Sequence, residues 1–196
     1  MDVAKPISSV IPTLDGPVLA TLAATTAPII LSEIHRRAGR GSKSGVRRVL
    51  SRMVQVGVIH EVLGGFVLNR DHVAANSVVA LADLHGELVR RIRLEVQSSG
   101  IETSLVGLFG SAARHDGDIT SDIDILIISE STDIDDFRGH LGKQVFLWTG
   151  NHAQVVAITN SELRRLRKVN EPIVANWNRD IVVISGDERV LKGGRS

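Results

Sequence analysis

The 196-residue sequence contains no cysteine. Disulfides and thiolate metal sites are therefore excluded, and the composition fits a reducing compartment. No apolar run approaches the roughly 18 residues that a bilayer-spanning helix needs, and the first residues lack the basic and apolar regions of an export signal. We therefore expect a cytoplasmic protein with no membrane partner.

Aromatic residues are also scarce, with no tyrosine, two tryptophans and four phenylalanines. Proteins that bind single-stranded nucleic acid stack successive bases on aromatic side chains, so a platform of that kind is not expected. The hydrophobic fraction of 43% and the charged fraction of 23% are ordinary for a globular protein. A chain of this length forms one medium domain or two small ones.

The net charge is only +1, but charges of each sign are concentrated in different segments. The segment HRRAGRGSKSGVRRVLSR (35–52) is rich in arginine and contains no acidic residue, whereas residues 116–136 contain several acids and no base. The basic segment suits phosphate backbones and the acidic segment suits cations.

The first part of the chain shows helical patterns that end in a hairpin pattern. We expect helices at 18–25, 31–39 and 42–57, then two strands within 58–70 around a turn at 63–65. Ser32 is the expected N-cap of the second helix, and Gly39 and Gly57 are expected to end the second and third helices.

This order of elements, with L-S-E-I-H-R-R-A and V-R-R-V-L-S-R-M-V-Q-V-G-V-I-H, resembles a winged helix-turn-helix domain over residues 15–70. The resemblance implies that the helix after the turn enters the major groove of double-stranded DNA. The DNA-binding positions would be Ser42, Lys43, Ser44, Arg47 and Arg48. Further phosphate contacts would come from Arg36, Arg37, Arg40 and Arg52. The alternative is a solvated basic face on a fold kept for protein contacts.

Residues 71–98 read as one long connecting helix. Its apolar stripe repeats at steps of three and four residues and consists of Leu81, Leu84, Leu88, Ile92 and Val96. We expect the stripe to pack on the second module, and a homodimer seam is the alternative.

The second module, residues 99–190, alternates strand and helix patterns. The expected strands are 103–109, 122–129, 153–159 and 181–186, with helices at 134–141 and 160–169, the latter capped by Ser161. The fold class is therefore α/β (α+β), in which an N-terminal winged helix precedes a mixed β-sheet with flanking helices. The KGGRS tail (192–196) is expected to be disordered.

Asp122 and Asp124 lie at the start of an apolar strand pattern. Residues at i and i+2 of a strand point to the same face, with Cα atoms roughly 6.5 Å apart. Two such carboxylates repel each other unless their charge is compensated, and hard oxygen ligands suit Mg²⁺ or Mn²⁺. The alternative is that Asp122 caps the strand and Asp124 pairs with a nearby arginine.

Gly110 and Ser111 follow directly on another apolar strand pattern, and SAAR begins like a helix. Free backbone N–H groups and a hydroxyl at such a turn suit an anion, and glycine permits close approach of a ligand. Alone, the pair would be a simple helix cap. Together with the two aspartates, it predicts an enzyme that holds a metal-bound nucleotide.

The sequences G-S-A-A-R (110–114) and S-D-I-D-I-L-I-I (121–128) closely resemble the signature of DNA polymerase β-like nucleotidyltransferases, particularly the minimal ones, over roughly residues 85–190. The resemblance implies that Gly110 and Ser111 hold a nucleoside triphosphate, with ATP favoured. It also implies that Asp122 and Asp124 are catalytic and coordinate two Mg²⁺ ions, which activate the acceptor hydroxyl and steady the leaving pyrophosphate. Arg114 and Ser121 would be supporting phosphate contacts.

The sequence departs from this family at His115, where the family often has Gly or Arg, and more consequentially at a position on a later strand. The family usually has a third carboxylate on a neighbouring strand, and the matching position here is Gln154. An amide offers a metal one neutral oxygen but cannot act as a base. Chemistry would then be slow, use another base such as His152, or be lost.

Two functions follow from these patterns. The first is a Mg²⁺-dependent enzyme that transfers a nucleoside monophosphate to a hydroxyl of a protein, an RNA such as tRNA, or a small molecule, with a DNA-binding winged helix. Some minimal nucleotidyltransferases act in toxin–antitoxin pairs, which suggests a protein or tRNA acceptor. The second is a transcription regulator whose nucleotidyltransferase-like domain is inactive and only binds nucleotide or mediates assembly. Gln154 favours the second function, and the intact Gly-Ser and Asp-x-Asp patterns favour the first.

Overall fold

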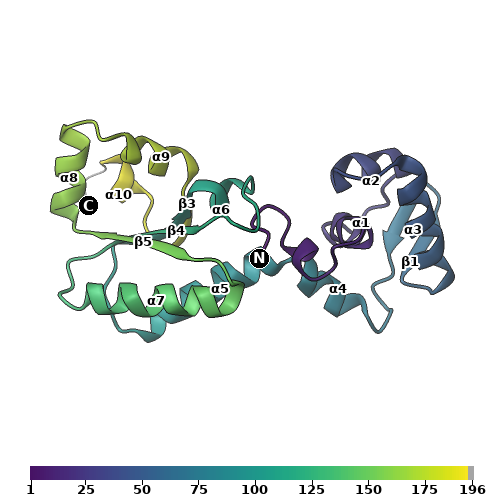
Figure 1. The fold of residues 1–196 in the computed structure, drawn as a ribbon, viewed down its shortest axis with the longest axis horizontal. Coiled ribbons are helices and arrows are strands. Elements are labelled where there is room, and N and C mark those ends of the chain that lie inside the picture. The colour runs from purple at the N-terminus through teal and green to yellow at the C-terminus, as the bar shows by residue number, and fades with distance from the viewer. Residues whose placement is uncertain (194–196) are drawn as a thin grey trace. The chain divides into compact units, whose positions relative to one another are not determined.

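The structure is a computed structural model that describes residues 1–193 (Figure 1). The chain forms two compact units. Lys5–His85 make up one, here called the helical unit, while Met1–Ala4 and the residues from Gly86 onward make up the other, here called the sheet unit. Within residues 1–193, no helix is both long enough and apolar enough to cross a membrane.

The helical unit contains four α-helices, a short 3₁₀ helix and one hairpin among its described residues. In chain order they are η1 (Pro6–Ser9), α1 (Asp15–Ala23), α2 (Leu31–Ala38), α3 (Lys43–Gln55), β1 (Ile59–Val62), β2 (Gly65–Leu68) and α4 (Ala75–Ala82). The two strands are antiparallel, and an isolated bridge between Ile29 and Phe66 adds the residues before α2 to the hairpin. The apolar face of α3, including Val46 and Leu50, is fully buried in this unit's core.

The ends of α2 and α3 follow the local sequence only in part. Ser42 caps α3, because its side chain accepts a hydrogen bond from the Gly45 N–H, and Gly39 ends α2 in the left-handed conformation at φ 67°. The prediction that Ser32 caps α2 is wrong. The N-cap is Ile30, which has no side-chain bond, and Ser32 lies within the helix.

The stretch predicted as one connecting helix is two helices. α4 ends at Ala82, Asp83 is its C-cap, and α5 spans Leu84–Ser98. The apolar stripe is divided accordingly. Val78 and Leu81 pack in the core of the helical unit, whereas Leu88 and Ile92 are buried in the sheet unit. Periodicity alone predicts a single helix, because it does not reveal that the two halves of the stripe pack in separate cores.

The sheet unit is built on a four-stranded mixed sheet in the order β5-β4-β3-β6. β4 pairs in parallel with β5 and antiparallel with β3, and β3 pairs antiparallel with β6. In chain order after α5, the elements are β3 (Leu105–Phe109), α6 (Gly110–Arg114), β4 (Ile123–Ile128), α7 (Ile134–Thr149), β5 (Ala153–Ile158), α8 (Asn160–Lys168), α9 (Pro172–Asp180), β6 (Val182–Gly186) and α10 (Arg189–Lys192). The mixed α/β class is therefore the one that the sequence predicts.

Helices cover both faces of the sheet (Figure 1). Ile123 and Ile125 of β4 pack with α5 and α7, while Leu126 and Ile128 pack with α8, α9 and α10. β4 is thus a central strand buried on both faces, which explains its nearly continuous apolar sequence. The polar residues Asp122 and Asp124 lie at the start of β4, at the end of this strand's apolar sequence.

Several elements differ from the sequence prediction. α7 continues to Thr149 instead of ending near residue 141, and α9 and α10 were not predicted. The predicted cap of α8 is also wrong, because Thr159, not Ser161, forms a capping box with Glu162. In the predicted disordered tail, Lys192 ends α10 and Gly193 is its C-cap, and residues 194–196 lie outside the described residues.

Replacing Thr159 with alanine tests this cap. The Thr159 hydroxyl accepts a hydrogen bond from the Glu162 N–H at 3.1 Å, so T159A should lower the free energy of unfolding by about 1 kcal/mol. S161A, two residues further along, removes only a hydroxyl that bonds the Thr159 hydroxyl and should change it by no more than about 0.5 kcal/mol. Urea unfolding of both variants measures the difference, and equal effects would contradict the assignment.

Gly110 supplies a second test, at the junction of β3 and α6. Its φ is +66°, and a Cβ atom there would lie 2.3 Å from the Asp124 Oδ2. G110A should therefore destabilise the protein by at least about 1–3 kcal/mol in urea unfolding. G139A is the matched control, since its Cβ would meet no atom within 4 Å in α7, and it should stabilise the protein by about 0.5–1 kcal/mol. A G110A variant as stable as wild type would show that this backbone approach is not required.

Candidate active site

The site lies at the end of the sheet where β3 ends and β4 begins. The register pairs Phe109, the last residue of β3, with Asp124 in β4. The chain then turns at Gly110 into α6, so the Gly110 backbone passes directly beside the Asp124 carboxylate. Only a residue without a side chain allows this approach.

Asp122 and Asp124 face the same side of the sheet. Asp124 is half-buried on the face shared with Leu126, and Asp122, two residues earlier, is exposed. Burial raises the pKa of Asp124, the negative charge of Asp122 raises it further, and the positive charge of Arg114 opposes both. The two carboxylates therefore carry negative charge that the protein compensates only in part.

The alternative role for these aspartates, an ordinary ion pair, does not fit the structure. Within residues 1–193, neither Asp122 nor Asp124 forms a salt bridge, and the nearby Arg114 pairs instead with Asp116 and Asp180. Charge of this kind, on hard oxygen ligands, suits a divalent cation.

The ligands available near the aspartates are few. Among the described residues, no group of three or more Asp, Glu or His side chains is placed to hold a metal ion. Mg²⁺, however, commonly binds through one or two carboxylates together with water and the phosphates of its substrate. Two carboxylates on one face therefore fit Mg²⁺ or Mn²⁺ that arrives with a nucleotide.

Gln154 lies next to the two aspartates. The parallel register pairs it with Asp124, so both side chains project from the same face of the sheet. His152, the other base considered from the sequence, is placed differently. Its ring lies against Phe146 of α7, with centroids 5.2 Å apart, and α7 covers the opposite face. The His152 ring therefore packs on α7.

The predicted nucleotide-binding serines come together around Gly117. A Cβ atom on Gly117 would lie 2.9 Å from the Ser111 Oγ and 2.8 Å from the Ser121 Oγ. The Ser121 hydroxyl also closes the loop before β4, because it accepts a hydrogen bond from the Asp118 N–H at 2.9 Å. Since α6 has only five residues, anion binding here would depend on individual N–H and O–H groups rather than on a helix dipole.

Arg114 is the predicted phosphate contact whose position is most strongly fixed. Its guanidinium donates to Asp116 at 2.8 Å and to Asp180 at 2.7 Å, and these two bonds raise the pKa of Arg114. The Asp180 side chain is only 4% exposed. Hydrogen bonds from Arg179 and from Arg114 lower the pKa of Asp180 to about 2. The cluster ties α6 to α9 beside the aspartates.

Sequence reasoning missed two residues that organise this region, Asp180 and Asn151. Asp180 lies at the end of a helix that was not predicted. Asn151 is buried at 4% exposure, and its side chain donates to backbone carbonyls on the loop before β4. No sequence signal could have identified Asn151, because its partners are main-chain atoms far away in the chain.

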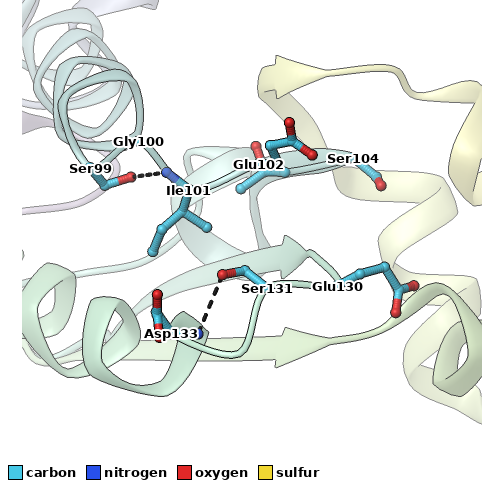
Figure 2. Close-up of a pocket in the computed structure, with 9 residues that line it drawn as sticks. Ser99, Gly100, Ile101, Glu102, Ser104, Glu130, Ser131 and Asp133 are labelled. Carbon is cyan, nitrogen blue, oxygen red and sulfur yellow. Dashed lines mark hydrogen bonds between the residues drawn. The ribbon is translucent and has the colours of Figure 1, made fainter.

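A separate cavity of about 690 Å³ opens at the other end of the sheet (Figure 2). It is lined by the segment from Ser99 to Ser104 before β3 and by Glu130, Ser131 and Asp133 after β4. Asp122 and Asp124 are not among its lining residues, so this cavity is not part of the candidate active site.

The basic residues of the helical unit divide into two groups. Arg36 and Arg37 pair with Glu33, Arg52 pairs with Asp15, and Arg40 donates to the carbonyls of Pro12 and Thr13. The exposed cations of α3 with no ion pair within the described residues are Lys43, Arg47 and Arg48. Ser42 and Ser44 bond to each other at the start of α3.

Comparison with known proteins concerns the sheet unit. No curated protein matches the chain. Among solved structures, a toxin–antitoxin complex with AMP-PNP is 18% identical, with a TM-score of 0.41 over 53% of this chain and 77% of that chain. A tri-AMPylated Shewanella oneidensis HEPN toxin in complex with MNT antitoxin is 16% identical, with a TM-score of 0.38 over 54% of this chain and 75% of that chain. Because both TM-scores are low, these likenesses carry no argument.

The comparison with protein-family models, in contrast, identifies the family of the chain. Residues 89–188 match the nucleotidyltransferase domain. The match covers just over half of the chain and includes the turn at Gly110 and both Asp122 and Asp124, so the chain belongs to the nucleotidyltransferase domain family.

Proposed function

We propose that the sheet unit transfers a nucleoside monophosphate from a nucleoside triphosphate, with ATP the first candidate, to a hydroxyl on a protein, an RNA or a small molecule. The observation that carries the proposal is the approach of the Asp124 carboxylate to the turn at Gly110, with Asp122 near enough to raise the pKa of Asp124, inside the segment that belongs to the nucleotidyltransferase family. The acceptor oxygen would bond to the α-phosphorus as the bond from that phosphorus to the pyrophosphate oxygen breaks.

Asp122 and Asp124 would hold Mg²⁺ or Mn²⁺. The bound cation would neutralise the triphosphate and make the acceptor hydroxyl more acidic. The protein's part is to place two carboxylates on one face, where burial and the negative charge of Asp122 raise the pKa of Asp124. Their free charge is the reason that a cation would bind there.

The triphosphate would lie along the turn and the loop that precede β4. Ser111 and Ser121 converge around Gly117, and Arg114 is held by carboxylates on both sides. Groups fixed in advance stabilise a developing charge without reorganising at the moment of reaction. We assign Gly110, Ser111, Ser121 and Arg114 to the phosphates on this basis.

Gln154 sets an expectation for the rate. A positioned general base typically contributes about 10²–10⁴-fold, and the amide beside Asp124 cannot supply it. The acceptor proton would leave to water or to one of the two aspartates, so turnover should be slow. The alternative function, a regulator that only binds nucleotide, is favoured by this same residue.

Removing the two carboxylates tests the enzyme proposal. Calorimetric titration of each nucleoside triphosphate, with and without Mg²⁺, should show metal-dependent binding to wild type and none to the D122N/D124N variant. D187N is the matched control, since Asp187 is a partly exposed carboxylate of the same unit that pairs with Arg189, and it should bind as wild type does. Single-turnover assays with D124N should show no transfer.

The outcomes separate the two functions. Unchanged binding by D122N/D124N would refute the metal assignment. Metal-dependent binding without turnover on any acceptor would support the regulator. Absence of binding in wild type would leave the sheet unit without a nucleotide function.

We infer for the helical unit that it binds double-stranded DNA as a winged helix. The order α1, bridge, α2, α3, hairpin supports this function, as do Lys43, Arg47 and Arg48 on α3, which form no ion pair within residues 1–193. Ser42 and Ser44, at the start of α3, would contact the DNA beside them. Arg36, Arg37 and Arg52, in contrast, already have carboxylate partners within the unit.

This division predicts different effects for two double variants. R47A/R48A should weaken duplex binding and reduce the slope of log K against log salt by about 0.9 for each DNA phosphate that an arginine no longer neutralises. R36A/R37A removes the same charge from α2 and should have little effect, because Glu33 already pairs with both side chains. Fluorescence anisotropy with random duplex at several salt concentrations measures both slopes. Equal weakening by the two variants would show that overall charge, not α3, governs binding.

A further inference from the structure

The position of Asp122 depends on contacts different from those that fix Asp124. Asp124 lies inside β4, where the ladder pairs it with Phe109 on one side and Gln154 on the other. Asp122 precedes the strand and has no ladder partner. The separation of the two carboxylates therefore depends on whatever holds the chain at residue 122.

Two consecutive residues hold the backbone on either side of Asp122. The Asn151 side-chain amide donates to the Ser121 carbonyl at 2.9 Å, and the Ile123 N–H donates to the His152 carbonyl at 2.8 Å. Both contacts come from the short connection between α7 and β5. Of the two, only the Asn151 contact uses a side chain, so it can be removed by mutation.

Asn151 is built into this connection. It is only 4% exposed, and its own N–H donates to the Thr149 hydroxyl at 3.1 Å. Its side-chain amide also donates to the Met1 carbonyl at 3.0 Å and, more weakly, to the Ile119 carbonyl at 3.4 Å. A buried amide with several main-chain acceptors is both oriented and costly to disrupt.

The loop that Asn151 holds is also closed from within and from the N-terminal segment. The Asp118 N–H donates to the Ser121 hydroxyl at 2.9 Å. The Val3 N–H donates to the Asp118 carbonyl at 3.4 Å, and the Val3 side chain is 1% exposed. Asn151 is thus the buried side chain that joins the N-terminal segment, the loop and the start of β4.

We propose that Asn151 is a positioning residue that sets the place of Asp122 relative to Asp124, and thereby the affinity of the aspartate pair for a divalent cation. The proposal rests on the function proposed for that pair. Asn151 would contact neither the cation nor the nucleotide and would act only through the backbone of residues 119–122.

Asn151→Asp is the sharpest variant, because it keeps the shape of the side chain. It replaces the amide donor that faces the carbonyls of Ser121 and Ile119 with an acceptor, so these two contacts become repulsive, while the other side-chain oxygen keeps its bond from the Met1 ammonium. Mutation of the partners that orient metal ligands typically weakens metal binding by about ten- to a hundredfold. N69D is the matched control, since the Asn69 amide holds the Gly57 carbonyl at 2.8 Å in the helical unit.

The first measurement is titration of the Mn²⁺–ATP complex into each full-length protein, read by electron paramagnetic resonance. N151D should bind the complex at least about tenfold more weakly than wild type, and N69D should bind as wild type does. Wild-type affinity in N151D would overturn the positioning role. No binding of the complex by wild type would instead refute the metal assignment, and the inference with it.

The second measurement is amide hydrogen exchange without metal, which separates local positioning from general loss of structure. Exchange in N151D should accelerate at residues 119–123 and remain unchanged in β3 and α9. Faster exchange throughout the sheet unit would show a merely structural role. If N151D does not fold, N151S removes the amide without adding charge, and the same two measurements decide the question.

Discussion

The structure of the site depends on one electrostatic constraint, which is that two carboxylates lie on the same face at the start of a buried strand. β4 can hold Asp124 there because its apolar residues pack on both faces of the sheet, so the strand cannot shift to relieve the repulsion from Asp122. The packing energy of the two cores maintains a local arrangement that the charges themselves oppose. A cation bound between the two carboxylates would attract both of them and so offset their mutual repulsion. The arrangement therefore suits a cation-binding site better than a purely structural role.

The surrounding residues adapt to this constraint in different ways. Gly110 lets the backbone pass beside Asp124 without a side chain. The positive charge of Arg114 partly offsets the rise in the pKa of Asp124. Ion pairs with Asp116 and Asp180 nevertheless hold the Arg114 guanidinium. The arginine therefore reduces the repulsion without neutralising the pair. A direct ion pair with Asp124 would have occupied the place that a cation needs.

The sequence predicted the parts of the site whose causes are local. The apolar runs of β3 and β4, the glycine between strand and helix, and the i and i+2 spacing of the aspartates all follow from near neighbours. Asn151 and Asp180 could not be predicted, because their partners lie about thirty and sixty-six residues away. The contact between the His152 ring and Phe146 could not be predicted either, since α7 runs further than its sequence pattern indicated.

The fold shows the same division between local and distant causes. Gly39 and Ser42 end and begin helices as their local chemistry predicts. The break between α4 and α5 depends on two separate cores, and a periodic stripe does not reveal which core each residue joins. Thr159 rather than Ser161 caps α8 because Thr159 is the single residue between the end of β5 and the start of α8.

Because Gln154 is uncharged, the position of Asp122 matters more for the cation affinity of the proposed site. The affinity of a protein site for a hard cation rises with the number of charged ligands and with the rigidity of the site. With an amide beside Asp124, the proposed metal site would have two charged ligands, so repulsion in the absence of metal would be smaller and attraction for the cation would be weaker than with a third carboxylate. Rigidity must then supply a larger share of the affinity. Asp124 derives its rigidity from the ladder of β4, whereas Asp122 derives it from the connection between α7 and β5, where Asn151 is buried.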